Sequence, residues 1–160
     1  MKFGWINVFG AVFVILLLIP NIIYALRNKD EKNLCKNQLM NGIEQIGRYA
    51  CIVLMWLPLL VWKFGFASVA EMIIYLAGNA VFLTAYWIVF AGYLKRKTRK
   101  RALILAVLPT CIFLVSGLLL RHWLLAGFAV LFGIGHIYVT RKNAEHIIDA
   151  ERTRLPQDDP

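Results

Sequence analysis

Five long apolar stretches, separated by short charged segments, limit what this chain of 160 residues can fold into. They cover residues 5–26, 46–66, 72–94, 102–120 and 123–140. A helix needs about 20 mostly apolar residues to cross a bilayer, because the hydrocarbon core is about 30 Å thick and each residue rises about 1.5 Å. Each stretch is long enough to cross once, and none is long enough to cross twice. The sequence therefore predicts a bundle of five transmembrane helices.

The composition excludes an ordinary soluble domain. Hydrophobic residues make up 60% of the chain and charged residues 17%, whereas soluble domains have about 45–50% and about 25%. Unpaired backbone groups are costly in lipid, so spanning segments are helices or strands of a closed barrel. Barrel strands alternate polar and apolar residues, which the run 12–19 does not. We expect an all-α polytopic membrane protein, with a transmembrane domain at 1–142 and a tail at 143–160 that is partly helical and then frayed.

The lysines and arginines predict how the bundle is oriented. Basic residues in short loops stay on the cytoplasmic side of a membrane. Most of the 18 Lys and Arg residues lie in the loop after the first stretch, the loop after the third, and the tail. The alternate segments hold only Lys2, Lys63 and Arg121. We therefore expect a bacterial-type plasma (inner) membrane protein whose N-terminus lies outside and whose C-terminus lies in the cytoplasm.

The connection between the third and fourth stretches is almost entirely basic. Its cations are Lys95, Arg96, Lys97, Arg99, Lys100 and Arg101. Such a loop determines topology and attracts anionic lipid headgroups, by about 1 kcal/mol for each cation near the surface. The net charge of +9 thus has a local explanation, and no module typical of nucleic-acid binding accompanies it. We expect membrane lipids as partners of this loop and no nucleic acid, with a specific headgroup site as the alternative.

Polar side chains within the apolar stretches concentrate toward the cytoplasmic half of the membrane. Counted at about 1.5 Å per residue from the middle of each stretch, they are Asn21, Arg48, Tyr49, Tyr86 and His136. An ionisable group at this depth costs about 2.5–3.5 kcal/mol to insert and normally faces the bundle interior. We expect these residues to bind a ligand in a cavity open to the cytoplasm. Arg48 would hold an anionic group there, and His136 or Tyr86 would donate a hydrogen bond.

Two structural interpretations compete with that site. Arg48 can extend to the membrane rim and pair with Glu44, one turn earlier on the same helix face. His136 follows Gly133 and Gly135, which allow a neighbouring helix to approach closely, and it can hydrogen-bond across that contact without binding a ligand. The sequence leaves the structural and the ligand-binding interpretations open.

Other residues predict local features of the helices. Asn41, with Glu44 three residues later, has the form of a helix start. Pro20 leaves the carbonyl of Leu16 without its helical donor, which makes this carbonyl available near the expected cavity. Pro58 and Pro109 predict bends in the second and fourth helices, because a proline inside a helix removes one backbone hydrogen bond.

Pairs of small residues four apart predict close helix contacts. Ala80 with Thr84 and Ala129 with Gly133 have this spacing, which allows two helix backbones to approach each other. The contact can lie within the chain, between copies of it, or with another membrane protein.

The sequence contains no motif for metal or cofactor chemistry. The three cysteines and three histidines are scattered, without the paired spacing of a zinc site. A Gly-rich phosphate loop, an H-E-x-x-H pair and a G-x-S-x-G turn are missing from the sequence. We therefore expect no metal, no cofactor and no catalytic residue.

These observations favour a non-catalytic membrane protein that binds a lipid or small amphiphile or a membrane partner. One alternative is a small oligomeric transporter or channel subunit, which needs a polar path through both leaflets. Another is an intramembrane lipid-modifying enzyme, which needs His136, Tyr86 and Arg48 to face one pocket.

Overall fold

The chain folds into a bundle of helices. The computed structural model describes residues 6–28, 33–59, 61 and 65–154, with side chains described as far as His146. The helices are α1 (Val8–Arg27), α2 (Gln38–Trp56), α3 (Val69–Lys95), α4 (Arg99–Leu119) and α5 (Trp123–Arg154). No β-strand occurs among the described residues. The predicted all-α fold class is confirmed.

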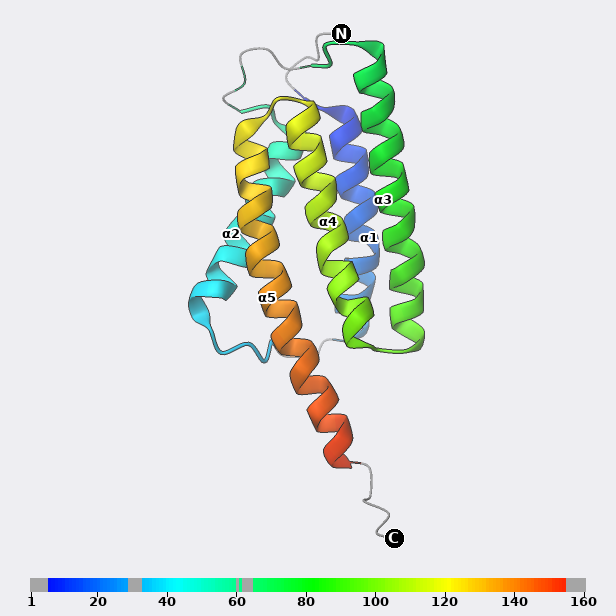
Figure 1. Cartoon of the computed structure of the whole chain (residues 1–160), viewed down its shortest axis with the longest axis vertical. Helices are drawn as coiled ribbons and strands as arrows, with labels where there is room; N and C mark the ends of the chain where they lie inside the picture. Colours follow the sequence, from blue (N-terminus) through cyan, green and yellow to red (C-terminus); the bar gives the residue numbers. More distant parts are fainter. Residues whose placement is uncertain (1–5, 29–32, 60, 62–64, 155–160) are drawn as a thin grey trace.

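The helices alternate in direction along the bundle (Figure 1). Helices α1, α3 and α5 run one way, and α2 and α4 return. The start of α1 and the end of α5 therefore lie at opposite ends, and the last turns of α5 extend beyond the other helices. The described basic residues follow this arrangement: Arg27, Lys36, the loop 95–101 and Arg141 lie at the end where α1 finishes, and Arg121 at the other.

Four helices are long and apolar enough to cross a membrane: α1, α3, α4 and the segment Trp123–His146 of α5. They indicate a multi-pass membrane protein. Helix α2 is not among them, because its first half carries polar and charged residues (Gln38, Asn41, Glu44, Gln45 and Arg48). Its second half is apolar.

The second helix begins earlier than the predicted 46–66. It starts after Asn37, whose side chain accepts a hydrogen bond from the Met40 N–H at 3.2 Å. Asn41, predicted as the helix start, lies inside the helix and donates its side-chain N–H to the Cys35 carbonyl at 2.9 Å. Asn37 and Asn41 are both suited to cap a helix, and the earlier one does so.

The same helix ends earlier than predicted, at Trp56. Pro58 has no N–H and disfavours the helical conformation of the residue before it. Leu57 is accordingly extended. The proline therefore ends α2, and the prediction that it bends the helix is wrong.

The remaining helices lie close to their predicted ranges, except that α5 continues to Arg154. The tail was predicted to be partly helical, and its first part is a continuation of the last helix. Residues 155–160, predicted to be frayed, lie outside the described residues, as do Lys2 and Lys63.

Glycines bring α5 very close to α2 and α4. A Cβ added to Gly47 of α2 would lie 2.8 Å from the Phe132 backbone, and one on Gly135 of α5 would lie 2.7 Å from the Glu44 backbone nitrogen. Between α4 and α5, a Cβ on Gly117 would lie 2.7 Å from the Ala126 nitrogen. Any larger residue at these positions would separate the helices.

The two predicted small-residue pairs have different surroundings. Ala129 is fully buried, and a Cβ on Gly133 would lie 2.6 Å from the Thr110 methyl, so this pair packs within the chain. Ala80 and Thr84 are exposed on α3. A contact of this pair with a second copy of the chain or with another membrane protein stays a prediction.

Candidate functional site

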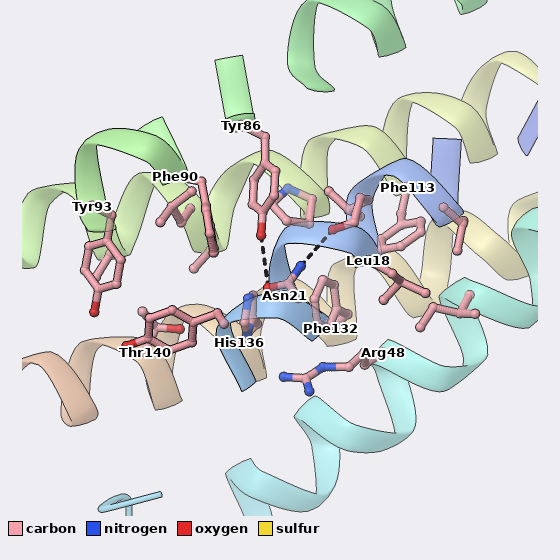
Figure 2. Close-up of a pocket in the computed structure, with 18 residues that line it drawn as sticks. Leu18, Asn21, Arg48, Tyr86, Phe90, Tyr93, Phe113, Phe132, His136 and Thr140 are labelled. Carbon is pink, nitrogen blue, oxygen red and sulfur yellow. Dashed lines mark hydrogen bonds between the residues drawn. The ribbon is translucent and has the colours of Figure 1, made fainter. Parts of the chain in front are cut away.

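A cavity of about 250 Å³ lies among the five helices, toward the end where α1 and α3 finish (Figure 2). Its walls are mostly aliphatic and aromatic. The aromatic residues that line it are Tyr24, Tyr86, Phe90, Tyr93, Phe113 and Phe132. The cavity exists because α1 packs on α2 and α3 but leaves space between itself and the tightly joined pair α4 and α5.

Four of the five predicted ligand-binding residues line this one cavity. Asn21 comes from α1, Arg48 from α2, Tyr86 from α3 and His136 from α5. Tyr49 does not join them and is 63% exposed. Adjacent residues on a helix point about 100° apart, so Tyr49 faces away when Arg48 faces inward.

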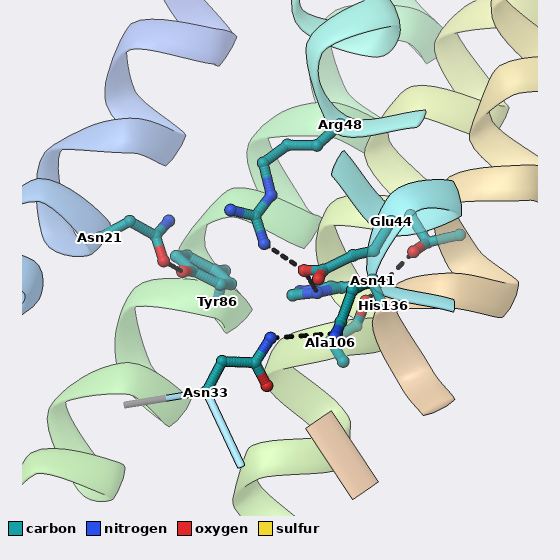
Figure 3. Close-up of polar contacts among 9 residues, drawn as sticks. Asn21, Asn33, Asn41, Glu44, Arg48, Tyr86, Ala106 and His136 are labelled. Atoms are coloured by element: carbon teal, nitrogen blue, oxygen red, sulfur yellow. Dashed lines mark hydrogen bonds and ion pairs between the residues drawn. The ribbon is translucent and has the colours of Figure 1, made fainter. Parts of the chain in front are cut away.

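The charged centre of the site is Glu44, which is only 3% exposed (Figure 3). Its Oε1 accepts a hydrogen bond from Arg48 Nη2 and lies 2.9 Å from His136 Nδ1. A buried carboxylate needs such partners, because its desolvation would otherwise destabilise the fold. The close contact at Gly135 places Glu44 beside α5.

The sequence identified only part of this arrangement. The predicted pairing of Arg48 with Glu44 is confirmed, but Arg48 also lines the cavity. Glu44 was expected near the membrane rim, and its burial was not anticipated. The interpretation that His136 hydrogen-bonds across a close helix contact agrees with the structure, but the sequence did not name Glu44 as its partner. Gly47 and Gly135 carried the available signal, because glycines on two helices permit a close crossing that buries the side chains beside it.

The Arg48 guanidinium has more donors than Glu44 uses. The side chain is 37% exposed, and its guanidinium has five N–H donors. Among the described residues, the contact of this group is with Glu44. Figure 2 shows the guanidinium beside the cavity, opposite Asn21 and Tyr86. The group can therefore bind an anion without leaving Glu44.

The side chains of Asn21 and Tyr86 already have hydrogen-bond partners within the protein. The Tyr86 hydroxyl donates to Asn21 Oδ1 at 3.0 Å, and the Asn21 side-chain N–H donates to the Leu17 carbonyl at 2.8 Å. The Leu16 carbonyl, which Pro20 was expected to leave available near the cavity, instead accepts from Trp87 Nε1 at 3.2 Å. It therefore joins α1 to α3 rather than serving a ligand.

Several cations of the basic loop contact the protein itself. Arg101 donates to the carbonyls of Gly92 at 2.7 Å and Arg96 at 3.2 Å, which satisfies backbone groups at the end of α3. Arg99 pairs with Glu145 at 2.9 Å. Lys97 Nζ lies 5.5 Å from the centre of the Tyr24 ring. Contact of this loop with lipid headgroups stays a prediction.

A second polar cluster lies at the opposite end of the bundle. It consists of Asn7, Tyr75, Asn79 and Ser116, each of which is fully buried. Ser116 Oγ donates to Asn79 Oδ1 at 3.2 Å, Asn79 Nδ2 donates to the Tyr75 carbonyl at 2.9 Å, and Asn7 Nδ2 donates to the Tyr75 hydroxyl at 3.5 Å. None of these residues lines the cavity.

His122 is buried near this second cluster, between α4 and α5. Its Nδ1 accepts a hydrogen bond from the Leu125 N–H at 3.4 Å, in the first turn of α5. Burial lowers the pKa of His122 from its ordinary value, and the backbone carbonyl of Leu57 partly offsets this effect.

The described residues contain no group of three or more His, Cys, Asp or Glu side chains that could hold a metal ion. The cavity instead combines a cation, an imidazole and a large apolar wall. This combination suits a molecule that has an anionic group and a hydrocarbon part.

The fold and its apolar helices thus define a multi-pass membrane protein. No protein-family model, curated protein or solved structure matches the chain. Comparison with known proteins therefore adds nothing to this class.

Proposed function

We propose that the protein binds a single-chain anionic amphiphile in the cavity between its helices. The observation that carries the proposal is the Arg48 guanidinium, which lines a cavity that is otherwise mostly apolar and aromatic. A guanidinium binds carboxylate and phosphate oxygens through paired N–H donors. The aromatic and aliphatic walls would take the hydrocarbon chain.

The size of the cavity favours a ligand with one chain. Its volume of about 250 Å³ lies below the range of about 300–1,000 Å³ typical of drug-sized ligands. A compact headgroup with part of one acyl chain suits this space, whereas a two-chain phospholipid would have to leave most of its volume outside.

The proposal includes five membrane crossings, with the N-terminus outside and the C-terminus in the cytoplasm. Helices α1 and α3 run in the same direction, so a chain that crosses in both must return to its starting side between them. Helix α2 runs in the required direction, and Glu44 is paired with Arg48 and His136. The positive-inside rule then assigns the basic end, and the cavity near it, to the cytoplasmic leaflet of a plasma membrane.

Reporter fusions test this topology. Alkaline phosphatase fused after Ala67, between α2 and α3, is expected to be active, and the same enzyme fused after His146 inactive. Green fluorescent protein at these positions is expected to give the opposite pattern. The phosphatase fused after Lys36, between α1 and α2, is expected to be inactive. Equal activity after Lys36 and Ala67 would exclude α2 as a crossing helix, and a phosphatase that is active after Lys36 and inactive after Ala67 would reverse the orientation.

Ligand binding can be tested with dodecanoate and the protein in phosphatidylcholine nanodiscs. The double variant Glu44→Gln/Arg48→Met removes the cation without leaving a buried carboxylate unpaired. Loss of a charge-assisted hydrogen bond is expected to weaken binding by about tenfold or more. The matched control is Arg99→Met: Arg99 also pairs with one glutamate, is 42% exposed and does not line the cavity. Equal binding by the double variant and the wild type would exclude the proposed role of Arg48.

The contact between Glu44 and His136 favours a second candidate function, intramembrane ester hydrolysis. A carboxylate that orients an imidazole is a common acid–base arrangement. His136 would take a proton from the water that attacks the ester carbonyl and return it to the departing alcohol. Release of dodecanoate from a dodecanoyl lysophospholipid, abolished by His136→Asn, would support this function. A wild-type protein without turnover excludes it.

A further inference from the structure

The contact with Glu44 determines which nitrogen of His136 carries the proton. An ionised carboxylate can only accept hydrogen bonds, and Glu44 is paired with Arg48. The 2.9 Å contact therefore requires His136 Nδ1 to be the donor. A neutral imidazole has one proton, so its other nitrogen, Nε2, is an acceptor.

The acceptor nitrogen lies on the cavity side of the ring. His136 lines the cavity, and its ring stacks on Phe132 with centroids 4.8 Å apart. Figure 3 shows the end of the ring opposite the Glu44 contact pointing toward Asn21 and Tyr86. The Tyr86 hydroxyl donates its proton to Asn21. Among the described residues, no donor hydrogen-bonds to His136 Nε2.

With a neutral imidazole, the site offers a charged donor and an acceptor a short distance apart, since Arg48 and His136 contact the same Glu44 oxygen. A plain carboxylate satisfies the guanidinium but brings only acceptors to Nε2. An acceptor left without a donor in a mostly apolar cavity is unfavourable. A headgroup with an O–H beside its anionic oxygen satisfies both groups.

We infer that the cavity selects anionic amphiphiles that carry a hydroxyl next to the anionic group, with His136 Nε2 as the acceptor of that hydroxyl. The inference rests on the proposed binding function and adds the chemical class of the ligand. The simplest members of the class are fatty acids with a hydroxyl on the carbon beside the carboxylate.

A competition experiment compares two acids that differ only in that hydroxyl. Wild-type protein in phosphatidylcholine nanodiscs is mixed with equal amounts of dodecanoate and 2-hydroxydodecanoate, and the bound acid is identified by native mass spectrometry. One neutral hydrogen bond corresponds to a preference of about three- to tenfold for the hydroxylated acid. In 2-methoxydodecanoate the hydroxyl proton is replaced, so this acid is expected to bind no better than dodecanoate.

Two variants assign the acceptor. His136→Asn keeps a side-chain N–H that can donate to Glu44 and removes Nε2, so the preference is expected to disappear. Tyr86→Phe removes a hydroxyl that lines the same cavity and could also accept, and the preference is expected to remain.

Each outcome bears on one part of the inference. Equal binding of both acids by the wild type overturns the selectivity and leaves the proposed binding function intact. Binding of neither acid removes both. A preference for 2-methoxydodecanoate over dodecanoate equal to that for the hydroxy acid, or a preference abolished by Tyr86→Phe but not by His136→Asn, overturns the assignment to Nε2. If His136→Asn does not fold, the comparison of the three acids on the wild type still decides the hydroxyl's role.

Discussion

The bundle buries polar residues at both ends, but with different results. At one end Asn7, Tyr75, Asn79 and Ser116 form a neutral cluster that is sealed from solvent. At the other, Glu44 is equally inaccessible, yet its partners Arg48 and His136 line a cavity. We refer to these as the closed cluster (Asn7, Tyr75, Asn79, Ser116) and the open cluster (Glu44, Arg48, His136).

The two clusters differ in whether any of their hydrogen-bonding groups remain available to a ligand. The closed cluster uses its amides and hydroxyls on one another and on backbone carbonyls, as expected of groups that hold helices together. The open cluster has guanidinium donors directed at a space large enough for a ligand. Burial of polar groups alone therefore does not indicate a binding site, whereas surplus donors facing a cavity do.

The largest expected effect comes from breaking the open cluster on one side. Arg48→Met leaves the buried Glu44 carboxylate without its cation and is expected to lower the free energy of unfolding by roughly 3 kcal/mol. Adding Glu44→Gln is expected to recover most of that loss, because no charge then remains buried. Denaturation in mixed micelles measures both values. If the single and double variants were equally unstable, charge pairing would not be what holds this cluster.

An intermediate effect is expected in the closed cluster. Asn79→Leu removes the acceptor of the Ser116 hydroxyl and the donor to the Tyr75 carbonyl, which is expected to cost about 1–2 kcal/mol. Dodecanoate binding, measured in nanodiscs, is expected to stay at the wild-type value. A large loss of binding would show that the two clusters are coupled and would break the comparison.

His122, which lies near the closed cluster, is expected to make the stability of the fold depend on pH. Burial lowers the pKa of His122 below the ordinary value of 6.5, so the unfolded chain takes up a proton at a higher pH than the folded one. Stability is therefore complete above pH 6.5 and falls as the pH drops through that value. The unfolding temperature between pH 8 and pH 5 is expected to fall less in His122→Gln than in the wild type. An equal fall in both would exclude His122 as the cause.

The smallest expected effect lies on the surface. Arg99 pairs with Glu145, which also contacts Arg141 and Lys142, but these groups are exposed enough for water to screen them. Arg99→Met is expected to change stability by less than about 0.5 kcal/mol, as measured by the same denaturation. A loss as large as that from Arg48→Met would mean that burial of Glu44 is not what distinguishes the open cluster.

Much of the fold follows from the sequence. The charge-free stretches predict an all-helical chain and place four of the helices close to their observed ranges, because the cost of unpaired backbone groups in lipid leaves few alternatives. The second helix was misplaced, since its cap at Asn37 and its end before Pro58 depend on local backbone geometry rather than on apolar length.

The candidate site was predicted only in part. Depth along the helices identified Asn21, Arg48, Tyr86 and His136, but depth does not say which way a side chain points. Tyr49 has nearly the same depth as Arg48 and faces outward. The rotation of each helix about its axis is a property of the packed bundle.

The sequence by itself determined that this chain forms apolar helices with its cations gathered at one end, because hydrophobicity and charge act residue by residue. Only the tertiary structure decided that Glu44 meets His136, 92 residues away. That contact depends on the crossing of α2 and α5, which the absence of side chains at Gly47 and Gly135 allows. Contacts between distant residues follow from how helices pack, and the pattern of residues along one helix does not identify the partner on another.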